Sequence, residues 1–533
     1  DAKNFYNLLK AVEKCYVNGK PRHASEGVYS NFHIMDEKVF KEMEPEAVAN
    51  IIRTKVLVLT NCENSNIEFN ARDLSNIASL SSPISVQDFS IVTEKPNDHH
   101  RVGNLQQILD CTTQENCKIL NVLDLPNSTS PLPITQYSSE LIAWNATIRS
   151  MFCQPHEHFP TSDMSWFLVG LANALHLGHI DSDGLGTVVE VRNRDGGKYW
   201  MKATRIPQTR EKLANVNLFI KFNLELPDLK HWILEGILLT NKTRIVMGPN
   251  SAHWVYTPFH TICSGGHYIS TPNMQDTLIG LIHTFMLDDF ITNINHPPTR
   301  ILFCRMATFY YDDLVQKKYN KFAAHGHVFN IQNFSGVLDV ISFCNLIILI
   351  NVLDFRTYMY NGEFTVNNFK RLTKERIASI EAFDYNALSA KERMRYQYAR
   401  GQAYAILDWL FKSVEIKEIP SGKIVKNPYH SLWIPLMAQQ ASALLVYKKK
   451  TMEAELRGAK GCTPAALKRQ ILLCFQCTLL EQAVNDAIEA EYEVFTFSDP
   501  TGYTATPLAK LKSALSEFIF AILYFNYIDK LYL

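Results

Sequence analysis

The sequence lacks an excess of charge of either sign, because 53 lysines and arginines balance 53 aspartates and glutamates over 533 residues. Whole-chain charge therefore gives no support to a nucleic acid, an anionic membrane surface or an acidic molecule as the partner. Internal repeats and low-complexity tracts are also lacking, so a repeat architecture is not expected. A folded chain of this length is expected to contain two or three domains.

Cysteine is present, but not as a disulfide framework. The eleven cysteines are an odd number, scattered from Cys15 onwards. Cys304 and Cys344 lie in apolar runs, where a free thiol behaves as a small hydrophobic side chain. Cys474 and Cys477 form a Cys-x-x-Cys pair without a second pair at zinc spacing, so we interpret them as core cysteines. This usage predicts an intracellular protein of the nucleus or cytoplasm.

No uninterrupted apolar run is long enough to cross a bilayer, and no signal peptide is recognisable. The most apolar stretch, residues 337–353, is broken by Asp339, Ser342, Asn345 and Asn351. We interpret it as a buried helix, and no membrane partner is expected.

Between residues 135 and 275, short β-branched and aromatic runs alternate with Gly, Asp and Asn turns. Many short strands at this spacing indicate a barrel or a double-sheet jelly roll, the group to which cupins belong. We therefore predict an α+β protein whose core, at 135–275, is a cupin-like double-stranded β-helix. The predicted strands are 166–172, 186–191, 199–205, 219–224, 243–247, 253–257 and 267–270.

The flanking regions follow other patterns. Residues 1–134 are predicted to be a mixed α/β region, with a strand at 55–60 and a short helix at 102–109. Residues 276–533 have a helical period and are predicted to form an all-helical C-terminal domain. Its helix starts are predicted at the capping-box candidate Ser389-x-x-Glu392, at Thr463-Pro464, and at Thr506-Pro507 before an apolar final helix around 518–525.

The segment around His179 and Asp181 carries the most chemical information. On a strand, positions i and i+2 point to the same side, so both side chains can approach one ion. Imidazole and carboxylate suit Fe(II), and a second histidine would complete a two-His-one-carboxylate triad with open coordination positions. Alone, His-x-Asp is a weak signal, for which an exposed turn with a solvated aspartate is the ordinary explanation. His176 and Asp183 also compete as ligands.

Two downstream motifs strengthen the pattern. Gly-Lys-Tyr-Trp at 197–200 places Lys198 nineteen residues after His179, and Gly-Pro-Asn-Ser-Ala-His at 248–253 places His253 seventy-four residues after it. A Gly-Pro turn just before a strand-borne histidine can return that side chain to the same barrel. Lys198 offers a point charge to the distal carboxylate of a dicarboxylic oxo acid.

Taken together, His179-x-Asp181, Gly-Lys-x-Trp at 197–200 and Pro-x-x-x-His at 249–253 resemble the JmjC class of 2-oxoglutarate oxygenases. The segments 184–191 and 264–268 look most like fungal JmjC-domain proteins. The resemblance covers about 135–275, with the approach at 121–126 as a candidate extension. It implies that His179, Asp181 and His253 bind Fe(II). It also implies that dioxygen and 2-oxoglutarate are cosubstrates.

The resemblance further implies that Lys198 pairs with the far carboxylate of 2-oxoglutarate. Many other oxygenases of this chemistry use an arginine about ten residues after the distal histidine, but here that position is Cys263. His267 lies near a position where relatives contact the cosubstrate, so it is expected either to bind there or to be a packed core histidine.

The function implied by this resemblance is a dioxygenase that hydroxylates or oxidatively demethylates a substrate, with a protein side chain as the expected substrate. One alternative is a catalytically inactive cupin scaffold whose helical half is a protein-interaction module. Another is a nucleic-acid oxygenase, which requires a basic channel with stacking aromatic residues. Trp200 and Trp254 flank the motifs, but buried strand tryptophans explain them equally well.

Overall fold

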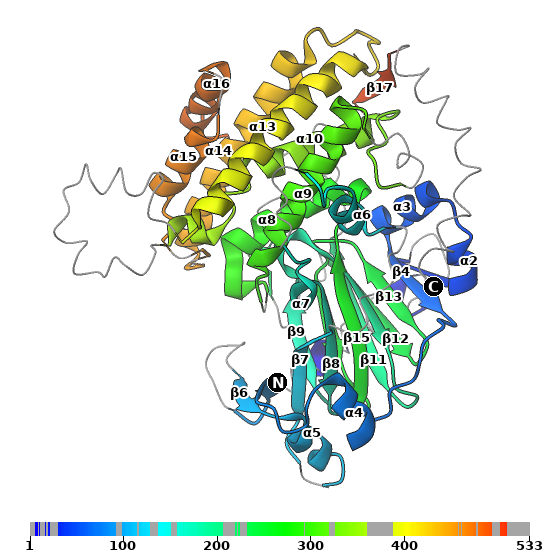
Figure 1. Ribbon diagram of the computed structural model, residues 1–533. Coiled ribbons are helices and arrows are strands. Elements are labelled where there is room, and N and C mark those ends of the chain that lie inside the picture. Colours follow the sequence, from blue (N-terminus) through cyan, green and yellow to red (C-terminus); the bar gives the residue numbers. More distant parts are fainter. Residues whose placement is uncertain are drawn as a thin grey trace, which may run out of the picture.

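The protein is described here from a computed structural model as an α+β molecule with two large sheets and many helices (Figure 1). The described residues are 6–8, 10, 16–17, 20–21, 30–91, 99–114, 117–127, 137–150, 157–205, 219–220, 222–223, 232–292, 294–318, 326–359, 387–456, 458–459, 461–475, 478–492 and 502–508.

The larger sheet has nine strands, and its order mixes strands from distant parts of the chain. β3 and β4 are parallel, whereas the other neighbouring strands are antiparallel. Residues before 135 supply five of the nine strands, two at one edge and three at the other. The order is β3 (Phe32–Asp36), β4 (Val56–Thr60), β13 (Arg244–Met247), β10 (Gly186–Val191), β15 (Thr261–Tyr268), β8 (Ser165–Gly170), β7 (Leu120–Pro126), β5 (Ile84–Asp88) and β6 (His100–Gly103).

The smaller sheet is antiparallel and packs face to face with the larger one. Its order is β12 (Trp232–Thr240), β11 (Gly197–Arg205), β14 (His253–Tyr256) and β9 (Leu175–His179). One apolar cluster joins side chains of both sheets, with Val189 and Cys263 from the larger sheet and Trp200, Leu239 and Val255 from the smaller one. Burial of this shared face holds the sheets together.

The helices that follow the sheets in sequence gather at one end of the sheets (Figure 1). A continuous apolar core runs from the inner ends of the sheets, at Ile180 and Trp254, into these helices. The helices after the sheets are α8 (Met274–Leu287), α9 (Arg300–Tyr310), α10 (Phe334–Ile348), α13 (Ala390–Ser413), α14 (Ile434–Glu453), α15 (Pro464–Leu473) and α16 (Thr478–Glu489). The earlier ones are α2 (Glu37–Lys41), α3 (Pro45–Thr54), α4 (Ala71–Ile77), α5 (Leu105–Cys111), α6 (Ser139–Ala146) and α7 (Thr161–Met164).

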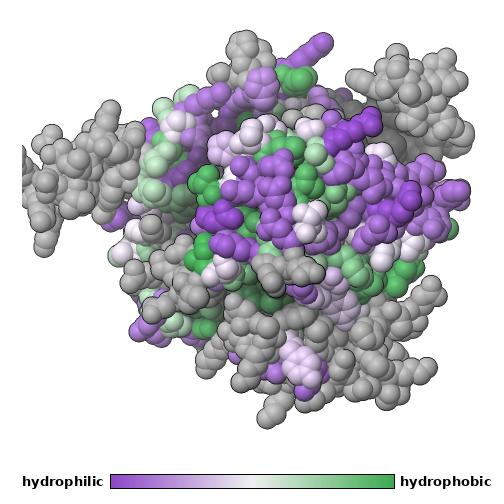
Figure 2. Space-filling model, turned by 90° about the horizontal axis from the view of Figure 1, so that it is seen from below, coloured by the Kyte–Doolittle hydropathy of each residue, from purple (hydrophilic) through white to green (hydrophobic). Residues whose placement is uncertain are grey.

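The surface at the other end of the sheets mixes hydrophilic and hydrophobic residues (Figure 2). Within the described residues, no helix combines the length and the apolar character needed to span a membrane.

Most of the predicted elements are confirmed. Six of the predicted strand segments overlap β8, β10, β11, β13, β14 and β15, and the strand at 55–60 is β4. The apolar stretch from 337 lies in the buried helix α10. Ser389 and Glu392 form the predicted capping box at the start of α13, and Thr463 caps α15. The helix expected at 102–109 begins only at Leu105, because His100–Gly103 pairs with β5 as β6.

Several predictions are wrong. Phe219 and Ile220 lie in a turn and not in a strand, because the Phe219 ring packs against Trp232 instead of entering a sheet. Thr506-Pro507 starts no helix: it ends β17 (Tyr503–Pro507), which pairs with β16 (Val414–Glu418). Among the described residues after 276, the regular secondary structure is therefore helical except for this two-stranded ribbon. The final helix expected around 518–525 lies outside the described residues.

The cysteine interpretation is partly confirmed. Cys304, Cys344 and Cys474 are buried thiols that form no disulfide with a described cysteine, whereas Cys477 lies outside the described residues. The sequence did not predict the disulfide that joins Cys111 and Cys117 at a separation of six residues.

Glu140 on α6 makes the stability of the fold depend on pH. Its side chain is 1% exposed, and its Oε2 accepts a hydrogen bond of 2.8 Å from the backbone N–H of Ile269. Burial raises the pKa of this carboxyl from 4.5 to about 8, so the folded protein holds the proton more tightly than the unfolded chain.

We therefore expect the contribution of Glu140 to the free energy of unfolding to fall as the pH rises from about 4.5 to about 8. Glu140→Gln has no such titration, so wild type should lose stability relative to this variant over that interval. Urea unfolding of both proteins at pH 5 and pH 8 measures the difference. An equal pH dependence in the two proteins would contradict the prediction.

Candidate metal centre

Two adjacent strands and the turn that follows one of them bring the three predicted ligands together. His179 ends β9, His253 begins β14, and the two residues are direct cross-strand partners. Asp181 follows two residues after His179. One donor atom from each of the three side chains lies within 4.8 Å of the other two, and His179 Nε2 is 4.0 Å from Asp181 Oδ1. The structure thus assembles a group that could bind one metal ion.

Both histidines are oriented by backbone hydrogen bonds. His179 Nδ1 lies 2.8 Å from the carbonyl oxygen of Leu177, and His253 Nδ1 lies 2.9 Å from that of Ser251. A carbonyl oxygen can only accept, so each Nδ1 must carry the proton and donate it. The lone pair of each neutral ring is then on Nε2, as in metal-ligating histidines whose second nitrogen is fixed by an outer hydrogen bond.

The electrostatics of the site favour the protonation states that bind metal. Burial, together with the neighbouring His253, lowers the pKa of His179 to about 4. Burial alone would raise the pKa of the Asp181 carboxyl, but the nearby histidines 253, 179 and 267 reverse this and lower it. At neutral pH the site therefore holds a neutral His179 and an ionised Asp181, which are the ligating forms.

The three residues line a pocket of about 100 Å³ between the two sheets. Lys198, the predicted cosubstrate residue, lies in the same pocket on β11 and is only 4% exposed. Its Nζ donates a 2.7 Å hydrogen bond to Thr257 Oγ1. Within the described part of the chain no carboxylate pairs with it, and burial lowers its pKa.

Two further polar atoms in this pocket are buried and make no hydrogen bond with described residues: Asn121 Oδ1 on β7 and His176 Nε2 on β9. Gly170 keeps the space between the sheets open, because a Cβ there would lie 2.8 Å from Asn121 Oδ1 and 3.3 Å from Lys198 Nζ. Buried polar groups are normally satisfied. A buried cation with unsatisfied neighbours in an open cavity fits a polar, anionic ligand better than an empty core.

The remaining sequence candidates occupy distinct places. His267 on β15 lines the pocket, with its Nδ1 3.1 Å from Thr187 Oγ1, and burial is the main cause that lowers its pKa to about 3. Thr187 and Asp181 line the same pocket, and Thr187 is one of the groups that lower the pKa of the Asp181 carboxyl. His176 lines the pocket but lies outside the three-ligand group.

Asp183 does not compete for the metal. Its carboxylate accepts a hydrogen bond from Arg300, at the start of a helix outside the metal pocket.

The two tryptophans are buried strand residues. Trp254 is 0% exposed, and Trp200 is 4% exposed with its ring stacked on His253 at a centroid distance of 5.1 Å.

Sequence reasoning missed the roles of Asn121, Thr187 and Thr257 in this pocket. Each lies on or directly after a strand whose inward face is fixed by strand alternation, but the alternation does not reveal which strands face one another. Asn121 lies in the candidate extension at 121–126, on β7 of the N-terminal region, but its place in the pocket was not predicted.

Comparisons with known proteins add no family assignment: neither a scan against family models nor a search of curated proteins finds a match for this chain.

Proposed function

We propose that the chain is an Fe(II)- and 2-oxoglutarate-dependent dioxygenase of the JmjC type that hydroxylates or oxidatively demethylates a protein side chain. The observation that carries this proposal is a buried lysine without a carboxylate partner among the described residues, in the same pocket as a two-His-one-carboxylate group. The buried lysine alone, or the two-His-one-carboxylate group alone, could be explained without a cosubstrate. Together they match a metal that leaves coordination positions open and a dicarboxylate that needs a cation.

The two facing sheets support the finer interpretation of the core as a double-stranded β-helix of the cupin kind. The metal-binding group lies on the smaller sheet, and His267 and Thr187 approach it from the larger one. Ligands held between two sheets are the usual arrangement for a jelly-roll site.

Each residue has a definite task in the proposed reaction. His179, Asp181 and His253 would hold the metal, and three protein ligands would leave coordination positions for the cosubstrates. When bound, iron supplies the oxidising chemistry, with the 2-oxo acid as the source of two electrons. Lys198 and Thr257 bind the far carboxylate.

Asn121 Oδ1 and His176 Nε2 offer polar contacts within the same pocket. The residues that line the pocket are mostly buried, which limits the access of water to the reacting atoms. If the hydroxylated carbon is bonded to nitrogen, the product loses formaldehyde and leaves a demethylated amine; otherwise an alcohol remains.

The proposal is tested with anaerobically prepared full-length protein. We expect one Fe(II) per chain and a rise in melting temperature with N-oxalylglycine, a 2-oxoglutarate analogue, only when metal is present. Succinate formation should require both iron and 2-oxoglutarate. Protein that binds neither metal nor analogue would overturn the proposal. Metal and analogue binding without turnover, even with candidate substrates, would instead support the inactive scaffold.

The substrate class needs a separate measurement. Proteins captured from a cell extract are analysed by mass spectrometry for the gain of one oxygen or the loss of one methylene unit. Only changes that require added 2-oxoglutarate count as products. Oxidation found on nucleic acid but on no protein would contradict the protein-substrate part of the proposal.

A further inference from the structure

We propose that Asp183 and Arg300 are a positioning pair, through which the helical half fixes the turn that presents Asp181 to the metal. This inference rests on the proposed metal site and assigns a role to two residues outside it. Asp183 lies two residues after Asp181, in the short 3-10 turn η1 (Ser182–Gly184), and Arg300 is the first residue of α9.

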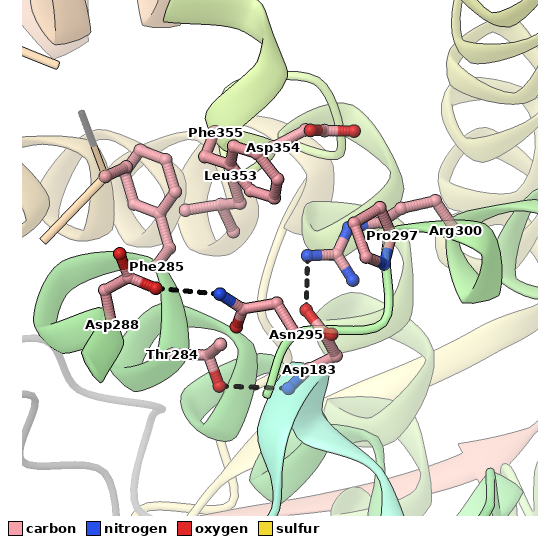
Figure 3. A pocket seen from close by; sticks show the side chains of 11 residues that line it. Asp183, Thr284, Phe285, Asp288, Asn295, Pro297, Arg300, Leu353, Asp354 and Phe355 are labelled. Atoms are coloured by element: carbon pink, nitrogen blue, oxygen red, sulfur yellow. Dashed lines mark hydrogen bonds and ion pairs between the residues drawn. The ribbon is translucent and has the colours of Figure 1, made fainter. Parts of the chain in front are cut away.

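Asp183 is held by hydrogen bonds from residues far along the chain. Its Oδ1 accepts one of 2.6 Å from Arg300 Nη2 (Figure 3). Its Oδ2 accepts one of 2.6 Å from the backbone N–H of His296. Its own backbone N–H donates to Thr284 Oγ1 on α8 at 2.9 Å. The carboxylate is 1% exposed, so these contacts replace the solvation that it has lost.

The backbone before Asp181 is tied to the same region. The N–H of Ile180 donates to the carbonyl oxygen of Ile291, 2.9 Å away. The ligand Asp181 therefore lies between two anchor points, both of them contacts with the segment that begins at α8. Fixing the chain on both sides of a ligand restricts where its carboxylate can point.

The turn also has an unusual backbone that needs such support. Asp183 has a φ of +60° and Gly184 a φ of +67°, a region that costs a non-glycine residue conformational energy. A Cβ on Gly184 would lie 2.1 Å from the carbonyl oxygen of Thr277, so the turn packs directly on α8. The aspartate adopts this conformation while its side chain is clamped by Arg300 and His296.

Arg300 is an anchor with few other partners. It is 5% exposed, and its Nε and Nη1 make no hydrogen bond with described residues. These atoms border a small cavity of about 20 Å³ that Asp183 and Asn295 also line (Figure 3). That volume can hold about one water molecule, not a ligand. Among the described residues, the hydrogen bond to Asp183 Oδ1 is therefore the contact that the guanidinium makes at this turn.

A purely structural ion pair would affect stability alone, so the test needs a readout at the metal. Co(II) is used as the probe, because its visible absorption reports ligand geometry independently of turnover. Asp183→Asn and Arg300→Gln are compared with wild type by Co(II) titration and by absorption spectrum. We expect a loss of Co(II) affinity of tenfold or more, as for other residues that orient metal ligands, and an altered spectrum.

Asp339→Asn is the matched control. Asp339 on α10 is also a buried aspartate, with a side chain 2% exposed and an arginine partner, Arg53 at 2.5 Å, and it lines neither cavity. This control should change stability without changing Co(II) affinity or the spectrum. Arg300→Lys keeps the charge but loses the planar fork, so it should retain more affinity than Arg300→Gln.

The outcomes separate this inference from the proposed function. If wild type binds Co(II) no better than His179→Ala, the metal site itself is wrong. If wild type binds and His179→Ala does not, but folded Arg300→Gln has the affinity and spectrum of wild type, the positioning role is overturned. Arg300→Gln tests the positioning role even if Asp183→Asn does not fold.

Discussion

Replacing His179 by alanine is expected to abolish iron-dependent formation of succinate and to lower metal affinity by more than about a hundredfold. Changes to residues that merely orient a ligand already cost about 10–100-fold in affinity, and this substitution removes the ligand itself. The remaining pair, Asp181 and His253, offers only two donor atoms. Anaerobic Fe(II) titration and a succinate assay measure both effects.

His327→Ala is the matched control for this variant. His327 is also buried, at 4% exposure, and hydrogen-bonds to Ser139 without lining the metal pocket. It should lose stability from truncation of a buried polar side chain while keeping the wild-type metal stoichiometry. Unchanged turnover in His179→Ala, or an equal loss of metal in both variants, would contradict the assignment of His179 as a metal ligand.

Substituting Lys198 by methionine is expected to raise the KM for 2-oxoglutarate by about thirtyfold or more, with little change in metal affinity. Removing one partner of a buried charge pair typically costs about 2 kcal/mol or more of binding free energy. Methionine has a similar length, so the pocket keeps its shape while it loses the cation. Steady-state kinetics at saturating Fe(II) give the KM.

Lys198→Met is expected to stabilise the folded protein, although it weakens the binding of 2-oxoglutarate. In the free protein the Lys198 ammonium is buried, and among the described residues it hydrogen-bonds only to Thr257; a buried charge without a counter-ion is costly. Lys198→Met should therefore raise the melting temperature of the metal-free protein, as expected where a binding group is kept at the expense of stability. A lower melting temperature would favour a structural role for the lysine.

Lys448→Met is the control for both measurements. Lys448 on α14 is likewise buried, at 1% exposure, but lies in the helical half and lines neither cavity. Its replacement should leave the KM for 2-oxoglutarate unchanged. An equal rise of KM in the two lysine variants would show that the effect is general and not specific to the pocket.

Sequence patterns predicted that His179, Asp181 and His253 lie close together, but they did not predict the backbone that brings them together. The i, i+2 argument expected His179 and Asp181 on one strand, yet β9 ends at His179 and Asp181 lies in the turn beyond it. The two side chains still converge because the turn is held from outside. The hydrogen bond from Arg300 to Asp183 joins residues far apart in the sequence, so no local sequence pattern predicts it.

The strand predictions failed where local pattern and long-range pairing disagree. Strand β12 (Trp232–Thr240) was missed, although its nine residues pair along the whole of β11. Its run is nearly continuous in apolar residues, and such a run does not distinguish a buried strand from a buried helix. The aromatic residues at 219 and 222 look like strand residues but pack around Trp232.

The contribution of the N-terminal region could not be read from the sequence either. Five of its strands complete the larger sheet on both edges, and one of them carries Asn121 into the pocket. Which strands become neighbours depends on the tertiary fold, since pairings between distant segments leave no periodic signal.

The anchoring of Asp183 by Arg300 also bears on how the protein is made. During synthesis, His253 leaves the ribosome about seventy residues after His179, and Arg300 follows about fifty residues later. A nascent chain that ends between these positions has all three ligands but an unsupported turn. Metal capture by this group should therefore be weak until α9 has emerged and Arg300 can hold the turn.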